Sequence, residues 1–161
     1  MRISFELDDT LVLYDGSPKE NVVPWWWRWR YHEPLRLGTQ ALMQSLLARN
    51  CELWIYTTSI REPRYLCNWF RSIGVKLTDV VNQDRHDQSV KKSHFPSYVP
   101  SKYPPAFGID LHVDDSEGVA LEGAEHGFRV VVVSPSEVNW GARVLAAVDE
   151  LVRARSSQDP A

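Results

Sequence analysis

The chain has 161 residues, of which 43% are hydrophobic and 24% are charged, and its formal net charge is −3. This length is enough for one domain with a buried core, and the composition excludes a disordered chain. The small negative charge excludes a broad surface for nucleic acid. There is no apolar run as long as a membrane span and no signal-peptide pattern at the start, so we expect a cytoplasmic protein without membrane attachment. Cys51 and Cys67 lack metal-binding spacing and are expected to be reduced.

Patterns typical of strands and helices alternate along the chain, which indicates a parallel sheet with crossover helices. The predicted strands are residues 2–7, 52–56, 80–81, 109–113 and 128–133. The predicted helices are residues 35–49, 63–72, 119–126 and 138–152. We therefore expect a three-layer α/β fold, with a five-stranded parallel sheet of the Rossmann-like kind, over residues 1–155. Residues 156–161 are expected to form a frayed tail.

Two segments interrupt this alternation. Residues 16–34 form a predicted flap rich in Trp and Arg, and residues 83–107 form a predicted irregular loop rich in Lys, His and Pro. A loop of that length inside a domain is more often functional than idle. Within it, the consecutive residues Arg85-His86-Asp87 cannot form a catalytic triad, and we interpret them as a solvated part of the loop.

The flap contains the run Trp25-Trp26-Trp27-Arg28-Trp29-Arg30, for which three interpretations stay open. The indoles can pack over the sheet and the helix that follows, because Trp buries a large apolar area. They can instead form a stacking wall on which Arg28 and Arg30 meet a phosphate or a base. They can also form the face of a homodimer.

Carboxylates gather directly after two of the predicted strands. Asp8 and Asp9 follow the first strand, near Glu6, and Asp114 and Asp115 follow the fourth. In an open α/β sheet, ligands bind just outside the carboxyl ends of the strands. Clustered carboxylates at that edge provide hard oxygen ligands, which suit Mg²⁺ and a phosphoryl group.

These residues give the chain a resemblance to the haloacid dehalogenase (HAD) superfamily, whose members are mostly phosphatases. The segment Phe5-Glu6-Leu7-Asp8-Asp9-Thr10-Leu11 is similar to the first HAD motif, an apolar strand ending in Asp-x-Asp. Glu6 falls on the position of the nucleophilic Asp, and Asp8 falls on that of the acid/base residue. The resemblance implies a HAD fold and, because neither insertion point holds a folded cap, an uncapped or minimally capped member.

The other three HAD motifs have counterparts in the same order. Thr57 and Thr58 end the second motif, Lys102 matches the third, and Asp114-Asp115 matches the acidic pair of the fourth. Lys91 and Lys92 lie in the same predicted loop as Lys102 and could supply the same charge.

The resemblance implies a Mg²⁺-dependent phosphomonoester hydrolase acting on a phosphorylated small molecule or nucleotide. It assigns catalytic roles to Glu6, Asp8, Thr57 and Lys102. It assigns phosphate binding to Thr57, Thr58 and Lys102, and metal binding to Glu6, Asp8, Asp114 and Asp115.

Glu6 departs from the family pattern, and three consequences are open. Glu is one methylene longer than Asp, so its carboxylate sits about 1.5 Å further along. The enzyme can turn over more slowly after a local shift, since a misplacement of about 1 Å can cost roughly a hundredfold in rate. Glu6 can instead ligate metal in a catalytically impaired pseudoenzyme that binds a phosphorylated ligand or partner. It can also support a metal-activated water.

Overall fold

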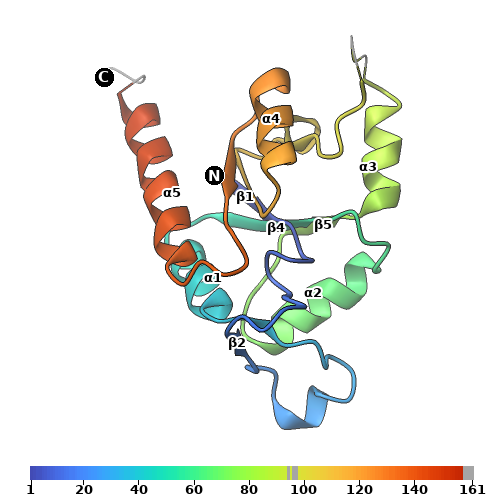
Figure 1. Ribbon diagram of the computed structural model, residues 1–161, viewed down its shortest axis with the longest axis vertical. Coiled ribbons are helices and arrows are strands. Elements are labelled where there is room, and N and C mark those ends of the chain that lie inside the picture. Colours follow the sequence, from blue (N-terminus) through green and yellow to red (C-terminus); the bar gives the residue numbers. More distant parts are fainter. Residues whose placement is uncertain (94, 96–97, 158–161) are drawn as a thin grey trace.

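The computed structural model describes residues 1–93, 95 and 98–157, and its centre is a five-stranded parallel sheet (Figure 1). The strands lie in the spatial order β5-β4-β1-β6-β7. Their bounds are Arg2–Phe5 for β1, Glu52–Tyr56 for β4, Asp79–Val81 for β5, Leu111–Asp114 for β6 and Val130–Val132 for β7. The predicted α/β fold with a five-stranded parallel sheet is confirmed.

Five helices cover this sheet from both sides, which makes three layers. Figure 1 shows α1, α2 and α5 on one side, and α3 and α4 on the other. Their bounds are Thr39–Ala48 for α1, Pro63–Ser72 for α2, Gln83–Val90 for α3, Glu117–His126 for α4 and Trp140–Ser156 for α5. Within the described residues, no helix combines the length and the apolar character needed to cross a bilayer.

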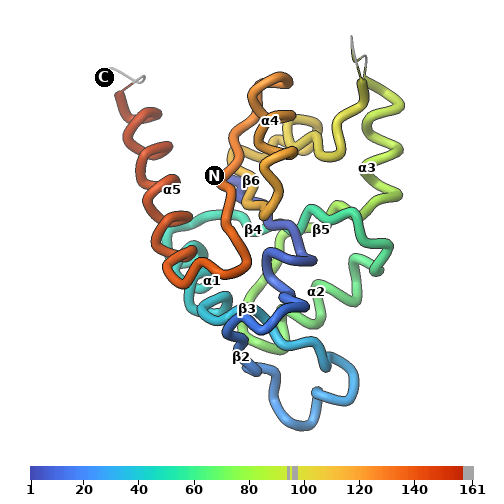
Figure 2. Tube along the Cα trace, in the orientation of Figure 1, coloured from blue at the N-terminus to red at the C-terminus, as the bar shows by residue number. Residues whose placement is uncertain are grey.

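The predicted flap at residues 16–34 carries only short elements. Strand β2 (Lys19–Glu20) pairs antiparallel with β3 (Leu35–Arg36), and a 3₁₀ turn, η1, spans Trp25–Trp27. Figure 2 shows this segment extending away from the body of the molecule. The flap therefore does not form a cap domain.

The helix predicted at 35–49 begins later, because its first residues pair as a strand. Leu35 and Arg36 belong to β3, and Gly38 then turns the chain with a φ of 88° before α1 starts at Thr39. A left-handed φ of this kind is strained for other residues, so the glycine separates strand from helix. The predicted bounds of 52–56 and 63–72 coincide with those of β4 and α2.

The prediction of an irregular loop over residues 83–107 is wrong for its first third, where α3 forms. The Asn82 side chain caps this helix by accepting a hydrogen bond from the Arg85 N–H at 3.2 Å. Arg85-His86-Asp87 lies within α3, and His86 is buried rather than solvated. The helix contains one apolar residue, Val90, so it has no apolar stripe from which sequence patterning could identify it.

A second 3₁₀ turn, η2 (Pro104–Phe107), leads into β6. Of the predicted tail, Ser156 is the last residue of α5, and residues 158–161 lie outside the described residues.

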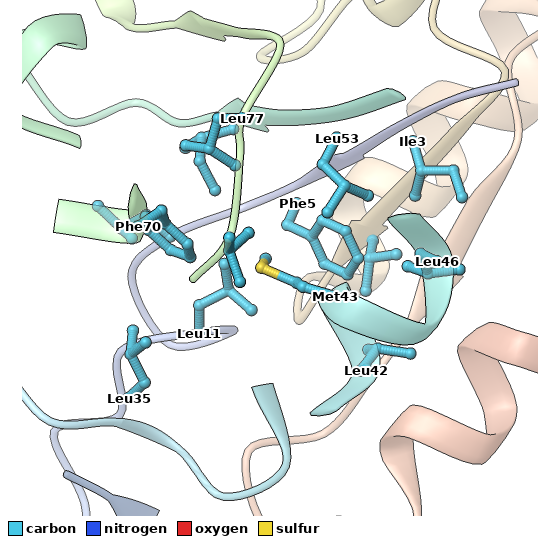
Figure 3. Close-up of a cluster of buried hydrophobic side chains, with 14 of the residues drawn as sticks. Ile3, Phe5, Leu11, Leu35, Leu42, Met43, Leu46, Leu53, Phe70 and Leu77 are labelled. Carbon is cyan, nitrogen blue, oxygen red and sulfur yellow. The ribbon is translucent and has the colours of Figure 1, made fainter. Parts of the chain in front are cut away.

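The main core lies between the sheet and α1, α2 and α5 (Figure 3). Leu42, Met43 and Leu46 of α1 are buried against Ile3 and Phe5 of β1. This packing holds the strand that leads directly into the first acidic cluster.

We expect Leu46→Ala to lower the free energy of unfolding by about 2–5 kcal/mol, because Leu46 is fully buried and the change leaves a cavity. Urea denaturation measures the loss. Leu121→Ala is the matched control, since Leu121 also lies in a helix but is exposed. Equal losses in both variants would contradict the assignment of the core.

Candidate functional site

A buried ion pair between Glu6 and Lys102 forms the centre of the candidate site. Glu6 follows β1, and its backbone N–H donates to the Val113 carbonyl of β6 at 2.8 Å. Its carboxylate contacts the Lys102 ammonium, and the exposed fractions of the two residues are 7% and 2%. The Leu7 N–H donates to the other Glu6 carboxylate oxygen at 2.9 Å. Because both charges are removed from water, each depends on the other for stabilisation.

Hydrogen bonds from two elements, α4 and β4, position the loop that carries Lys102. The Ser101 N–H donates to the Glu122 carboxylate of α4 at 2.9 Å. The Tyr103 N–H donates to the Tyr56 hydroxyl at 2.8 Å, and the Lys102 ammonium lies 5.4 Å from the centre of the Tyr56 ring. Lys102 is therefore held in place over the end of β4.

His86 completes this support through Tyr56. The Tyr56 oxygen accepts from the Tyr103 N–H, and it also lies 2.6 Å from Nδ1 of His86, with which it shares a hydrogen bond. His86 also makes a hydrogen bond with the backbone of Pro100. Burial lowers the pKa of His86, and the nearby Lys102 charge lowers it further. His86 is thus held neutral between β4 and the Lys102 loop.

Asp8 is bound by cationic and hydroxyl groups of the chain. Arg61 Nη1 donates to both Asp8 carboxylate oxygens at 3.0 and 2.9 Å, and the Tyr14 hydroxyl donates to one of them at 2.5 Å. Arg61 Nη2 also reaches Glu33 at 2.8 Å. Sequence reasoning missed Arg61, Tyr14 and Glu33, because none of them lies in a motif and only folding brings them together.

The two carboxylates of the fourth motif have different environments. Asp114 is buried, and one of its oxygens lies 2.9 Å from Nε2 of His112, whose other ring nitrogen lies 2.8 Å from the Ser4 hydroxyl. Burial alone raises the pKa of Asp114, but its hydrogen bonds to His112 and Ser116 outweigh burial and lower it.

Asp115 is half-buried and accepts a hydrogen bond from the Thr10 hydroxyl at 3.0 Å. Burial and the adjacent Asp114 charge raise its pKa. The contact between Thr10 and Asp115 joins the first motif to the fourth.

The second motif lies at the end of β4, beside β1. Thr57 is buried, and its hydroxyl accepts a hydrogen bond from the Ser59 N–H at 3.1 Å, whereas Thr58 is exposed. Since β1 and β4 are parallel with Phe5 opposite Ile55, Thr57 follows β4 at the level at which the chain leaves β1 for the first motif. Lys91 and Lys92 are exposed at the end of α3, so Lys102 is the loop lysine that contacts Glu6.

The carboxylates are oxygen donors of the kind Mg²⁺ prefers, but they do not converge. Over residues 1–93, 95 and 98–157, no group of three or more His, Cys, Asp or Glu side chains is arranged to hold a metal ion. Glu6 is paired with Lys102, Asp8 with Arg61, and Asp114 with His112. As arranged, Glu6 and Asp8 do not fit a magnesium ion, which would have to displace Lys102 or Arg61. Among the described residues, Asp115 has no cationic partner and accepts a hydrogen bond from Thr10.

Comparisons with known proteins give relatives in structure but not in sequence. No protein-family model matches the chain, and no curated protein matches it. The HAD domain of effector protein Lem4 from Legionella pneumophila, solved in two structures of which one is of an inactive mutant, matches 90% of this chain. Each match has 13% sequence identity and a TM-score of 0.51, and they cover 91% and 92% of the Lem4 chains. The chain has a HAD-like fold. At 13% identity this likeness concerns the fold alone.

A further match is to the structure of a Pnkp1/Rnl/Hen1 complex. It has 16% identity and a TM-score of 0.48, and it covers 81% of this chain and 45% of that one.

We expect Arg61→Met to strengthen Mg²⁺ binding several-fold, because it frees the Asp8 carboxylate from its cationic partner. Isothermal titration calorimetry with MgCl₂ measures the change. Arg49→Met is the control, since Arg49 is paired with Asp149 elsewhere on the molecule. Unchanged affinity in Arg61→Met would show that Asp8 takes no part in binding the ion.

We expect stability to fall as the pH is lowered below about 6.5, the ordinary pKa of His. The folded-state pKa of His86 is lowered, so below pH 6.5 the unfolded chain binds a proton that the folded chain does not. The free energy of unfolding falls by at most about 1.4 kcal/mol for each pH unit. Urea denaturation at several pH values gives the free energy of unfolding as a function of pH. This pH dependence should be smaller in His86→Gln and unchanged in the exposed control His32→Gln.

Proposed function

We propose that this protein is a HAD-like phosphomonoesterase in which Glu6 occupies the nucleophile position. The supporting observation is the arrangement of Glu6, Asp8, Thr57 and Lys102 at the carboxyl ends of β1 and β4 and in the loop before β6, with Lys102 in contact with Glu6. This edge of a parallel sheet is where α/β proteins bind ligands. Phosphoryl transfer depends mostly on positioning and charge neutralisation, and both are available here.

In the proposed reaction, Asp8 takes up a proton from solvent once Arg61 leaves it. A Glu6 carboxylate oxygen then bonds to phosphorus as the ester P–O bond breaks, and the leaving oxygen takes that proton from Asp8. Water then gives a proton to Asp8 and attacks the phosphorus. This step releases phosphate and restores the Glu6 carboxylate.

The cations of the chain have defined tasks in this scheme. Lys102 neutralises Glu6 in the resting site and then the phosphoryl oxygens. Arg61 has to leave Asp8 before that residue can move a proton, and it would then meet the anionic substrate. Thr57 would donate its hydroxyl hydrogen to a phosphoryl oxygen. Magnesium dependence, which the resemblance implies, stays a prediction that an assay with and without the ion tests.

A second candidate function is binding of a phosphorylated ligand without turnover. It is favoured by the pairing of both reactive carboxylates, Glu6 with Lys102 and Asp8 with Arg61. The extra methylene of Glu6 also moves its carboxylate by about 1.5 Å.

Hydrolysis of p-nitrophenyl phosphate, with Mg²⁺ and with EDTA, tests the proposal. We expect Asp8→Asn to slow hydrolysis by a factor of about 10²–10⁴, because it removes acid/base catalysis. Asp84→Asn, at an exposed position in α3, is the control. Full activity in Asp8→Asn would contradict the proposed role of Asp8. A native chain that binds phosphate without hydrolysis, together with turnover in Glu6→Asp, would favour the second candidate.

A further inference from the structure

The flap exposes aromatic side chains that the proposed reaction does not use. Trp25 and Trp29 are each 75% exposed, Trp26 is 56% exposed, and Trp27 is 40% exposed. Large indoles seldom face water together unless they meet a partner. The interpretation in which these indoles pack over the sheet is therefore wrong for Trp25, Trp26 and Trp29, whereas Trp27, the least exposed of the four, packs against the buried Tyr31.

One wall of the flap borders a cavity of about 590 Å³ against α2. The cavity is lined by Trp27, Arg30, Tyr31, Asn68, Arg71 and Ser72. The Trp27 and Tyr31 rings lie 5.9 Å apart, so two aromatic groups and two arginines contribute to one concave surface. A cavity of this size accommodates an organic ligand.

A second cavity, of about 410 Å³, extends this surface towards the candidate site. It is lined by Arg30, Arg61, Glu62 and Tyr65, so Arg30 contributes to both cavities. The Tyr31 and Tyr65 rings lie 5.3 Å apart and connect the two walls. Arg61 binds Asp8, so the second cavity borders the acid/base position. The two cavities share Arg30, and we refer to them together as the groove.

Two arginines of this groove have no acidic partner among the described residues, whereas Arg61 is paired with Asp8 and Glu33. Within the described part of the chain, Arg30 and Arg71 have no carboxylate within ion-pair distance, whereas Arg2, Arg49 and Arg85 are each paired with one. Arg64 and Asn68 precede Arg71 by seven and three residues, so all three lie on the same face of α2. Arg30, Arg64 and Arg71 therefore form a local cationic patch, while Glu62 lines the second cavity and Glu33 is paired with Arg61.

We propose that this groove binds the end of a single-stranded nucleic acid, with bases on Trp27 and Tyr65 and backbone phosphates on Arg30 and Arg71. Its terminal phosphate reaches Arg61 beside Asp8, so the inference rests on the proposed phosphomonoesterase function and specifies its substrate class. Aromatic faces for stacking, interleaved with cations for phosphates, are the features that single strands require. A lipid surface would contact the outward-facing Trp25 and Trp29 and would not need a groove that leads to Asp8.

Fluorescence anisotropy with a labelled six-residue oligothymidylate tests the groove. We expect saturable binding that weakens several-fold when the terminal phosphate is removed. Trp27→Ala should weaken it by at least about fivefold, whereas the flap control Trp25→Ala should change it by less than about twofold. Arg71→Gln should remove about one phosphate contact. The slope of the logarithm of the binding constant against the logarithm of the salt concentration should then become less steep by roughly 0.7. Arg153→Gln, a change at an exposed position in α5, should leave this slope unchanged.

The outcomes separate the groove from the proposed function. Hydrolysis of p-nitrophenyl phosphate without saturable oligonucleotide binding would overturn the groove inference and leave the phosphomonoesterase intact. If the oligonucleotide binds equally well with and without its terminal phosphate, the placement of that phosphate beside Arg61 is overturned. If, in addition, p-nitrophenyl phosphate is not hydrolysed, the proposed phosphomonoesterase function is overturned also. Binding to phosphatidylserine vesicles that is lost in Trp25→Ala, with no oligonucleotide binding, would identify a membrane surface and overturn the inference.

Discussion

The buried ion pair between Glu6 and Lys102 couples the first strand of the sheet to the loop that precedes β6. Removing one member of such a pair leaves an uncompensated charge in the interior, at a cost of about 3–5 kcal/mol. The pair therefore constrains its surroundings: Tyr56, His86 and Glu122 hold the loop so that the ammonium meets the carboxylate. These contacts extend from β4 through α3 to α4, so much of the domain supports one charge contact.

The site as folded is neutralised by the chain itself. Arg61 forms an ion pair with Asp8, and Lys102 forms one with Glu6. A phosphorylated ligand brings charge of the same sign as these carboxylates, so it can bind if it replaces them as the partner of the two cations. Arg61 also borders the aromatic groove, and one residue could therefore link ligand binding to release of the acid/base group.

Sequence patterning predicted the strands of the five-stranded sheet and four of the helices, because their apolar periodicity reflects burial in the core. It missed α3, since a helix with one apolar residue has no such periodicity. It also extended the helix at 35–49 over Leu35 and Arg36, which pair with β2 through backbone hydrogen bonds that side-chain pattern does not encode. For the site, it singled out Glu6, Asp8 and Lys102, because each follows or precedes a strand end in the order typical of HAD motifs.

The sequence by itself determined the α/β class, the five strands and the edge of the sheet at which the acidic residues gather, because these follow from local periodicity and strand direction. Tertiary structure decided which charges meet. Arg61 lies more than fifty residues from Asp8, and Lys102 lies nearly one hundred from Glu6. It also decided that Trp27 and Arg71 share a cavity. Such contacts depend on how separate elements pack, and local spacing carries no information about them.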